Sequence, residues 1–179
     1  MLNQNDCCLV VVDVQGKLAQ LMHDKETLFK NIRILIQSAK ILNIPILWCQ
    51  QVPAALGETI PEIAELLTDN KPINKSSFSC CGREEFNGKL KDTGRKQILL
   101  CGIETHVCVY QTAANLLAEN YEVEAIADAV SSRTSANKET GLKRIAAEGA
   151  KLSSAEMAIF EILKTAEHPQ FRQIAKLVK

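Results

Sequence analysis

Two stretches of this 179-residue chain are apolar at every position rather than at every second one: residues 8–12 (CLVVV) and residues 98–101 (ILLC). Strands covered by helices on both faces have this pattern, whereas a strand with one face in water alternates. Helical periodicity follows these runs, over residues 25–42 and 106–119. The chain therefore predicts a parallel sheet enclosed between two layers of helices.

The alternation of strand and helix continues along the chain, without a linker or an internal repeat. Strands are expected at residues 8–13, 45–49, 72–75, 97–101, 122–128 and 150–152, and helices at 25–42, 60–67, 84–91, 106–119, 136–148 and near the C-terminus. We expect an α/β fold, a three-layer α/β/α sandwich with a mainly parallel, doubly wound sheet of about six strands in the order 3-2-1-4-5-6. The length suits a single domain over residues 1–179.

Charge and composition exclude several classes of function. The 21 basic and 21 acidic residues give a formal net charge of zero, so there is no electrostatic footprint for nucleic acid or an anionic membrane. No apolar run is long enough to cross a bilayer. We expect a small-molecule substrate, with no nucleic-acid and no membrane partner.

Seven irregularly spaced cysteines and a polar N-terminal segment predict a reduced, cytoplasmic protein.

Three residues stand where strands of such a sheet should end. Asp13 follows the first strand, although it could instead cap a helix. Cys108 lies in the first turn of the helix expected from residue 106, where unpaired N–H groups and the helix dipole favour a thiolate. Lys75 could be an ordinary surface lysine, but an ammonium beside a carboxylate and a thiol would stabilise both anions. The topology brings the ends of the first and fourth strands together.

Other residues have simpler interpretations. Cys8, Cys49 and Cys101 are expected in the core, as free cysteines usually are. His106 is only two residues from Cys108, so it should project from another side of the helix and lie at the rim of a site.

Three motifs together resemble the isochorismatase-like cysteine hydrolase superfamily: VVDVQ at residues 11–15, NKSSF at 74–78 and CGIETHVCV at 101–109. The similarity extends over essentially the whole chain. Further segments resemble the subgroup called isochorismatase domain-containing proteins, at residues 50–59, 128–133 and 168–171.

The resemblance implies a parallel α/β fold and a catalytic triad of Asp13, Lys75 and Cys108, because each lies in its matching motif. It also implies a cis peptide bond between Ile103 and Glu104. The N–H of Glu104, with that of Cys108, would then form an oxyanion hole. Many relatives assemble as homo-oligomers and complete their pocket with a neighbouring subunit, so a homo-oligomer is expected.

Departures from the family pattern narrow the expected chemistry. Gln50 and Gln51 stand where nicotinamidase-type members have metal ligands, so no metal is expected; glycine-rich phosphate motifs are absent, so no cofactor is expected. True isochorismatases do not keep a cysteine nucleophile, so vinyl-ether hydrolysis is not expected with Cys108. Leu18 stands where the family often has an aromatic residue after the aspartate motif. The residues expected to line the pocket are Leu18, Gln51, Phe78 and Thr105.

The resulting hypothesis is a hydrolase of a small amide or related C–N bond, with a cysteine nucleophile and a thioester intermediate. Two alternatives remain at this stage. The fold could serve a catalytically silent ligand-binding or scaffold protein, because fold alone does not guarantee activity. It could also serve a thiol redox sensor built on Cys108 and the neighbouring cysteines Cys80 and Cys81, which are expected to be exposed.

Overall fold

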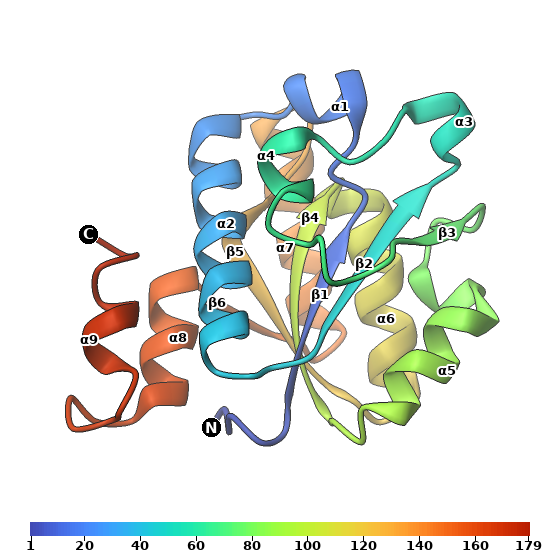
Figure 1. Cartoon of the computed structure of the whole chain (residues 1–179). Coiled ribbons are helices and arrows are strands. Elements are labelled where there is room, and N and C mark those ends of the chain that lie inside the picture. Colours follow the sequence, from blue (N-terminus) through green and yellow to red (C-terminus); the bar gives the residue numbers. More distant parts are fainter.

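The computed structural model describes residues 1–179, and a six-stranded, all-parallel sheet runs through its centre (Figure 1). The strands lie in the order β3-β2-β1-β4-β5-β6, with β1 and β4 paired side by side. This confirms the predicted sheet and its order. The strands are β1 (Cys7–Val12), β2 (Ile46–Gln51), β3 (Ile73–Lys75), β4 (Gln97–Ile103), β5 (Glu122–Ser131) and β6 (Lys151–Ser153).

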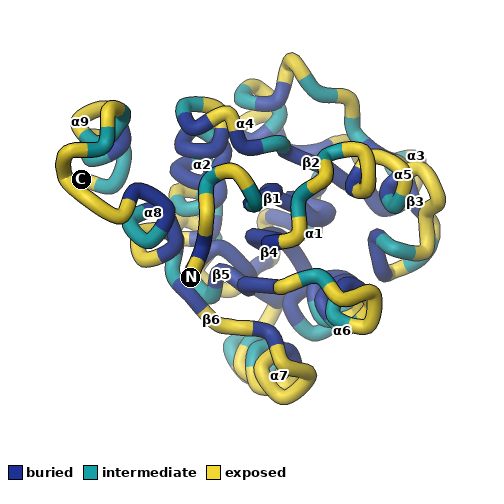
Figure 2. Tube along the Cα trace, turned by 90° about the horizontal axis from the view of Figure 1, so that it is seen from below, coloured by how far each residue is buried: buried dark blue, intermediate teal, exposed yellow.

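Helices cover both faces of the sheet and complete three layers (Figure 2). One face carries α2 and α8, and the other carries α5, α6 and α7. No helix is both long enough and apolar enough to cross a membrane. The helices are α1 (Gly16–Gln20), α2 (Lys25–Ile41), α3 (Pro53–Leu56), α4 (Pro61–Ala64), α5 (Glu84–Asp92), α6 (Tyr110–Ala118), α7 (Ser135–Ala147), α8 (Ala155–Leu163) and α9 (Phe171–Ile174), with a 3₁₀ turn at Cys80–Gly82 and a π-helical turn at Thr105–Val109.

The continuous apolar runs are explained by burial on both sides. Leu9 and Val11 of β1 point into a core of 31 buried residues shared with α2 and α8. Val10 and Val12 point into a second core of 20 buried residues shared with α5 and α6. Complete burial of such a side chain contributes about 1.5–3 kcal/mol, so β1 anchors both layers.

The connection from β4 to α6 differs from the prediction. An α-helix was expected from residue 106, but a five-residue π-helical turn, Thr105–Val109, comes first and α6 begins at Tyr110. Just before it, Gly102 has φ +117°, and a Cβ there would lie 2.1 Å from the carbonyl oxygen of Val12. The pairing of β4 with β5 shifts register at the same point. Glycine therefore lets β4 approach β1 closely where the site begins.

Candidate active site

Asp13 comes directly after β1, at the carboxyl edge of the sheet. Its backbone has φ +51°, a left-handed conformation that aspartate tolerates better than most residues, and its N–H donates to the carbonyl of Cys49 at 3.1 Å. The N-cap of α1 is Gln15, not Asp13. The alternative of a helix-capping aspartate is therefore wrong, and the carboxylate is free to face the interior of the site.

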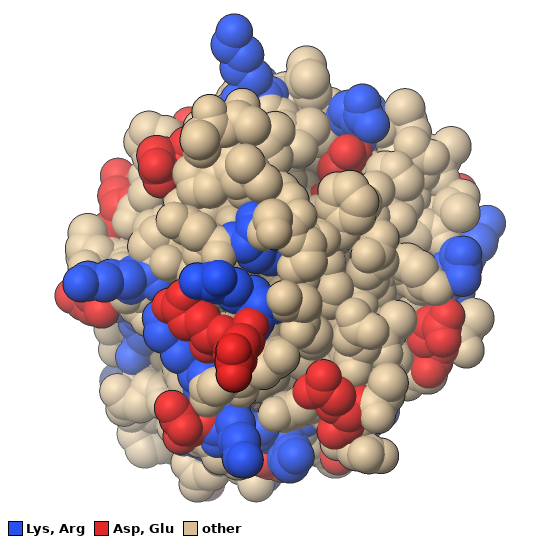
Figure 3. Space-filling view, turned by 90° about the vertical axis from the view of Figure 1, so that its right-hand side faces the viewer, with Lys and Arg blue, Asp and Glu red and all other residues tan.

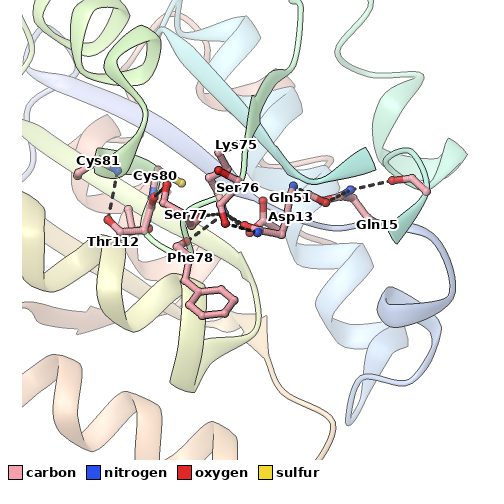
Figure 4. Close-up of polar contacts among 12 residues, drawn as sticks. Asp13, Gln15, Gln51, Lys75, Ser76, Ser77, Phe78, Cys80, Cys81 and Thr112 are labelled. Atoms are coloured by element: carbon pink, nitrogen blue, oxygen red, sulfur yellow. Dashed lines mark hydrogen bonds and ion pairs between the residues drawn. The ribbon is translucent and has the colours of Figure 1, made fainter. Parts of the chain in front are cut away.

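A buried ion pair joins Asp13 to Lys75 (Figure 4). The Lys75 Nζ lies 2.6 Å from Asp13 Oδ2 and 2.7 Å from Gln51 Oε1, and it also donates to the carbonyls of Ser77 and Phe78 at 3.2 and 3.0 Å. Its side chain is 0% exposed, so Lys75 is not a surface lysine. The ammonium reaches from β3 across β2 to the end of β1 and fixes the segment that follows β3.

Burial and charge act in opposite directions on this pair. Burial raises the pKa of Asp13 and outweighs the opposing effect of Lys75. Burial also disfavours the charged form of Lys75. The charge and hydrogen bond of Asp13, together with the nearby Cys80 and Cys108, more than compensate and raise the Lys75 pKa. The lysine therefore stays protonated. Asp13 Oδ1 is buried without a hydrogen-bond partner, which leaves one carboxylate oxygen available to accept a proton.

Cys108 lies in the π-helical turn and lines the same cavity as Asp13. Its side chain is buried, and the expectation of an acidic thiol is wrong. Burial first, and then the negative charge of Asp13, raise the pKa of Cys108 to about 12, although Lys75 acts in the opposite direction. The thiol is therefore protonated at rest, next to a carboxylate that is placed to accept its proton.

Asp13 and Cys108 both line a cavity of about 120 Å³. Leu18, Gln51 and Phe78 line it together with Asp13 and Cys108, but Thr105 does not. Thr105 is fully buried, and its hydroxyl has no hydrogen-bond partner, because the π-helical turn directs this side chain into the protein. A larger cavity of about 420 Å³ lies at the amino ends of β4, β5 and β6 and contains none of the motif residues.

Glu104 provides a further group at the cavity. The Ile103–Glu104 peptide bond is cis. The Glu104 N–H donates to no backbone carbonyl, while its carboxylate accepts from the backbone N–H of Arg133 at 3.0 Å and from Arg133 Nε at 3.2 Å. The side chain is thus held against Arg133, and the backbone N–H remains unpaired beside the cavity.

Sequence reasoning missed a glutamine that supports the site. Gln15 is fully buried; its Nε2 donates to the carbonyls of Gln51 and Gly57 at 3.1 and 2.7 Å, and its Oε1 accepts from the N–H of Gln51 at 2.6 Å. It therefore fixes the end of β2. The available signal was its place as the last residue of the VVDVQ motif, two residues after Asp13. His106, in contrast, contacts Ser132 Oγ at 3.0 Å and does not line the cavity.

The donor set offers little to a metal ion. No group of three or more histidine, cysteine, aspartate or glutamate side chains is arranged to hold one. Gln50 does not line the cavity and donates to Thr59 Oγ1 at 2.9 Å. All seven cysteines are free, and Cys8, Cys49 and Cys101 lie fully buried in the core as predicted.

A thiol, a carboxylate and an ammonium lie together at the carboxyl edge of a doubly wound α/β sheet, an arrangement typical of a protein of the hydrolase type. The chain belongs to the isochorismatase family: residues 7–157 match the Isochorismatase domain.

Individual relatives agree with this assignment. The chain is 40% identical to the secreted isochorismatase effector Isc1 of Phytophthora sojae, over 96% of this chain and 83% of that protein. It is 37% identical to isochorismatase domain-containing protein 2 of Danio rerio, over 95% and 85% of the two chains. A solved structure of MAR1 ribonuclease from Caenorhabditis elegans is 35% identical and superposes with a TM-score of 0.93, covering 99% of this chain and 91% of that one.

Proposed function

We propose that this protein hydrolyses a small-molecule amide or related C–N bond through a cysteine nucleophile and a thioester intermediate. The observation that carries the proposal is a small cavity lined by both Asp13 and the Cys108 thiol, with Lys75 paired to Asp13 behind the cavity wall. A nucleophile, its base and the group that orients the base are the recurrent parts of covalent acyl-transfer sites.

In the proposed first step, the Cys108 sulfur attacks the carbonyl carbon while its proton moves to Asp13. Because the thiol pKa is about 12, attack and proton transfer occur together rather than from a preformed thiolate. The backbone N–H groups of Glu104 and Cys108 would hold the developing oxyanion. Lys75 remains charged and keeps Asp13 oriented.

The second half of the reaction returns the site to its starting state. The C–N bond breaks as Asp13 gives its proton to the leaving nitrogen, which releases ammonia or an amine and leaves the acyl group on Cys108. Water then attacks the thioester carbon and passes a proton to Asp13. Collapse breaks the C–S bond, the sulfur recovers that proton, and a carboxylic acid departs.

The test combines ammonia release with intact-mass spectrometry. For amide substrates that the enzyme turns over, acid quenching is expected to trap an acyl adduct on Cys108, and Cys108→Ala is expected to lose at least about 1,000-fold in kcat/KM. Cys81→Ala is the matched control, since this half-buried cysteine lies outside the cavity. Equal turnover by Cys108→Ala and the wild type would refute the mechanism.

RNA is a separate question, because one similar structure carries the name ribonuclease. Sites for drug-sized ligands measure about 300–1,000 Å³, larger than the cavity of about 120 Å³ around Cys108. Basic and acidic side chains are interspersed on the face that carries α5 and β3 (Figure 3). We therefore favour a small amide, and RNA cleavage lost in Cys108→Ala would contradict that choice.

We also propose a homo-oligomer in a reducing compartment. All seven thiols are free, as is usual where the glutathione and thioredoxin systems keep cysteines reduced. Light scattering on the purified protein would measure the number of subunits.

A further inference from the structure

The cationic and amide side chains around the catalytic cavity are already engaged by the protein, whereas Asp13 Oδ1 has no hydrogen-bond partner. Four oxygens surround the three N–H donors of Lys75 within hydrogen-bond distance. Gln51 accepts from that lysine through Oε1 and donates through Nε2 to the carbonyl of Ser76 at 2.8 Å. The Glu104 carboxylate is held by Arg133. In Figure 4, the side chains of Asp13, Gln51 and Lys75 turn toward one another, so no cationic side chain in this cluster is left to bind an anionic substrate.

The remaining wall of the cavity is apolar and encloses little space. Five apolar side chains form it: Leu18, Leu56, Phe78, Ile103 and Val107. The volume of about 120 Å³ is small beside the roughly 300–1,000 Å³ of sites for drug-sized ligands. A short apolar acyl side chain suits this wall.

Phe78 closes this wall at the surface. Phe78 is 54% exposed, and its ring points away from the polar cluster (Figure 4). Its backbone carbonyl accepts from Lys75 at 3.0 Å, so the aromatic wall and the catalytic ion pair are held by the same ammonium. The backbone of this wall residue is therefore tied directly to the Asp13–Lys75 ion pair.

The charged groups around the cavity disfavour an anionic ligand. Two lining residues, Asp13 and Glu104, are carboxylates, and no lysine, arginine or histidine lines the cavity. The nearest ammonium, that of Lys75, is 0% exposed and paired. Lys75 and Arg133 are already paired with these two carboxylates, so an anionic acyl group would lose its water without gaining a cation of its own.

We infer that the cavity selects compact, uncharged amides whose acyl side chain is short and apolar, and that it rejects anionic analogues of the same shape. The inference rests on the proposed function and adds its substrate class. It assigns substrate selection to the apolar wall formed by Leu18, Leu56, Phe78, Ile103 and Val107.

A matched pair of amides tests the inference. 3-Methylbutanamide and malonamate have the same shape, with two methyl groups in the first where the second has two carboxylate oxygens. We expect kcat/KM for ammonia release to favour 3-methylbutanamide by at least about 100-fold, because the site leaves the anion unpaired. Cys108-dependent release that is equal for both, or faster for malonamate, overturns the inference and leaves the hydrolase proposal standing.

Substitutions in the apolar wall should lower the preference for 3-methylbutanamide over malonamate. Leu18→Arg places a cation in the wall and is expected to reduce the preference at least about 10-fold. Leu21→Arg is the control, since Leu21 is 62% exposed and does not line the cavity; its preference should match the wild type. Val107→Lys repeats the test if Leu18→Arg does not fold. An unchanged preference in a folded Leu18→Arg or Val107→Lys variant contradicts the inference.

A second measurement does not depend on amide hydrolysis. Iodoacetamide and iodoacetate differ in charge and alkylate the same thiol, so their rate ratio at Cys108, divided by the ratio for free cysteine, reports how the cavity treats an anion. We expect iodoacetamide to be favoured at least about 10-fold more at Cys108 than at free cysteine. If this selectivity appears but no amide is hydrolysed, the proposed function fails while the cavity's selectivity stands; a ratio equal to that of free cysteine refutes the selectivity.

Discussion

At the scale of single residues, the charge of Asp13 opposes ionisation of Cys108. Burial and this carboxylate raise the thiol pKa to about 12, so alkylation of the wild type should keep rising through the alkaline range. Asp13→Asn removes the negative charge and leaves Lys75 in place, so we expect the thiol pKa to fall and iodoacetamide labelling at mildly alkaline pH to become faster. Hydrolysis is expected to fall at least about 100-fold, because the base is gone.

The measurement is the rate of iodoacetamide labelling as a function of pH, with the modified site assigned to Cys108 by peptide mass. It tests whether the Asp13 charge opposes ionisation of the Cys108 thiol. Asp92→Asn is the control, since Asp92 is an exposed residue of α5 and should change neither rate. A labelling rate that falls together with hydrolysis in Asp13→Asn would show that the carboxylate activates the thiol at rest rather than during attack.

Residues at strand ends were predictable, and their environments were not. Asp13 and Cys108 were predicted to meet because the strand order alone brings the ends of β1 and β4 together. The direction of the Cys108 pKa shift was wrong, since it depends on burial and on a carboxylate from a distant part of the chain. Thr105 was misplaced for a related reason: the local geometry of the π-helical turn decides where it points.

At the scale of elements, Gly102 determines how β4 passes β1. A Cβ at this position would lie 2.1 Å from the carbonyl oxygen of Val12, and the backbone has φ +117°. We therefore expect Gly102→Ala to lower the free energy of unfolding by about 3 kcal/mol or more, measured by urea denaturation. Gly88→Ala in α5 is the control: no atom lies within 4 Å of its added Cβ, so it should be neutral or stabilising by up to about 1 kcal/mol. Equal stability of the two variants would contradict this role for Gly102.

The helical segment after β4 shows what periodicity does not detect. Apolar spacing placed a helix in the right region, but it does not distinguish a π-helical turn from the first turn of an α-helix. The close packing of α7 against this turn also depends on a non-local feature, Gly141, where a Cβ would lie 2.8 Å from the backbone N of His106. The layers and strand order follow from local patterns, whereas this turn depends on contacts between distant segments.

At the scale of the whole molecule, Lys75 ties an edge strand to the centre of the sheet. β3 has three residues and pairs with β2 alone, while the Lys75 ammonium reaches Asp13 at the end of β1. Lys75→Met would leave a buried carboxylate without its cation. Removing one partner of a buried pair costs about 3–5 kcal/mol, and we expect a loss of that size in urea denaturation at neutral pH.

The pH dependence of that loss separates electrostatics from packing. Without Lys75, the folded-state pKa of Asp13 should rise further above its ordinary value, so the folded protein binds the proton more tightly than the unfolded chain. Stability of Lys75→Met is then greatest at acid pH and falls as the pH rises through the folded-state pKa, and Asp13→Asn in the same chain should restore much of it at neutral pH. Lys89→Met, which breaks the exposed pair with Glu85 at 2.8 Å, should cost within about 0.5 kcal/mol. A loss for Lys75→Met that does not vary with pH and is not restored by Asp13→Asn would mean that packing, rather than charge, holds β3 in place.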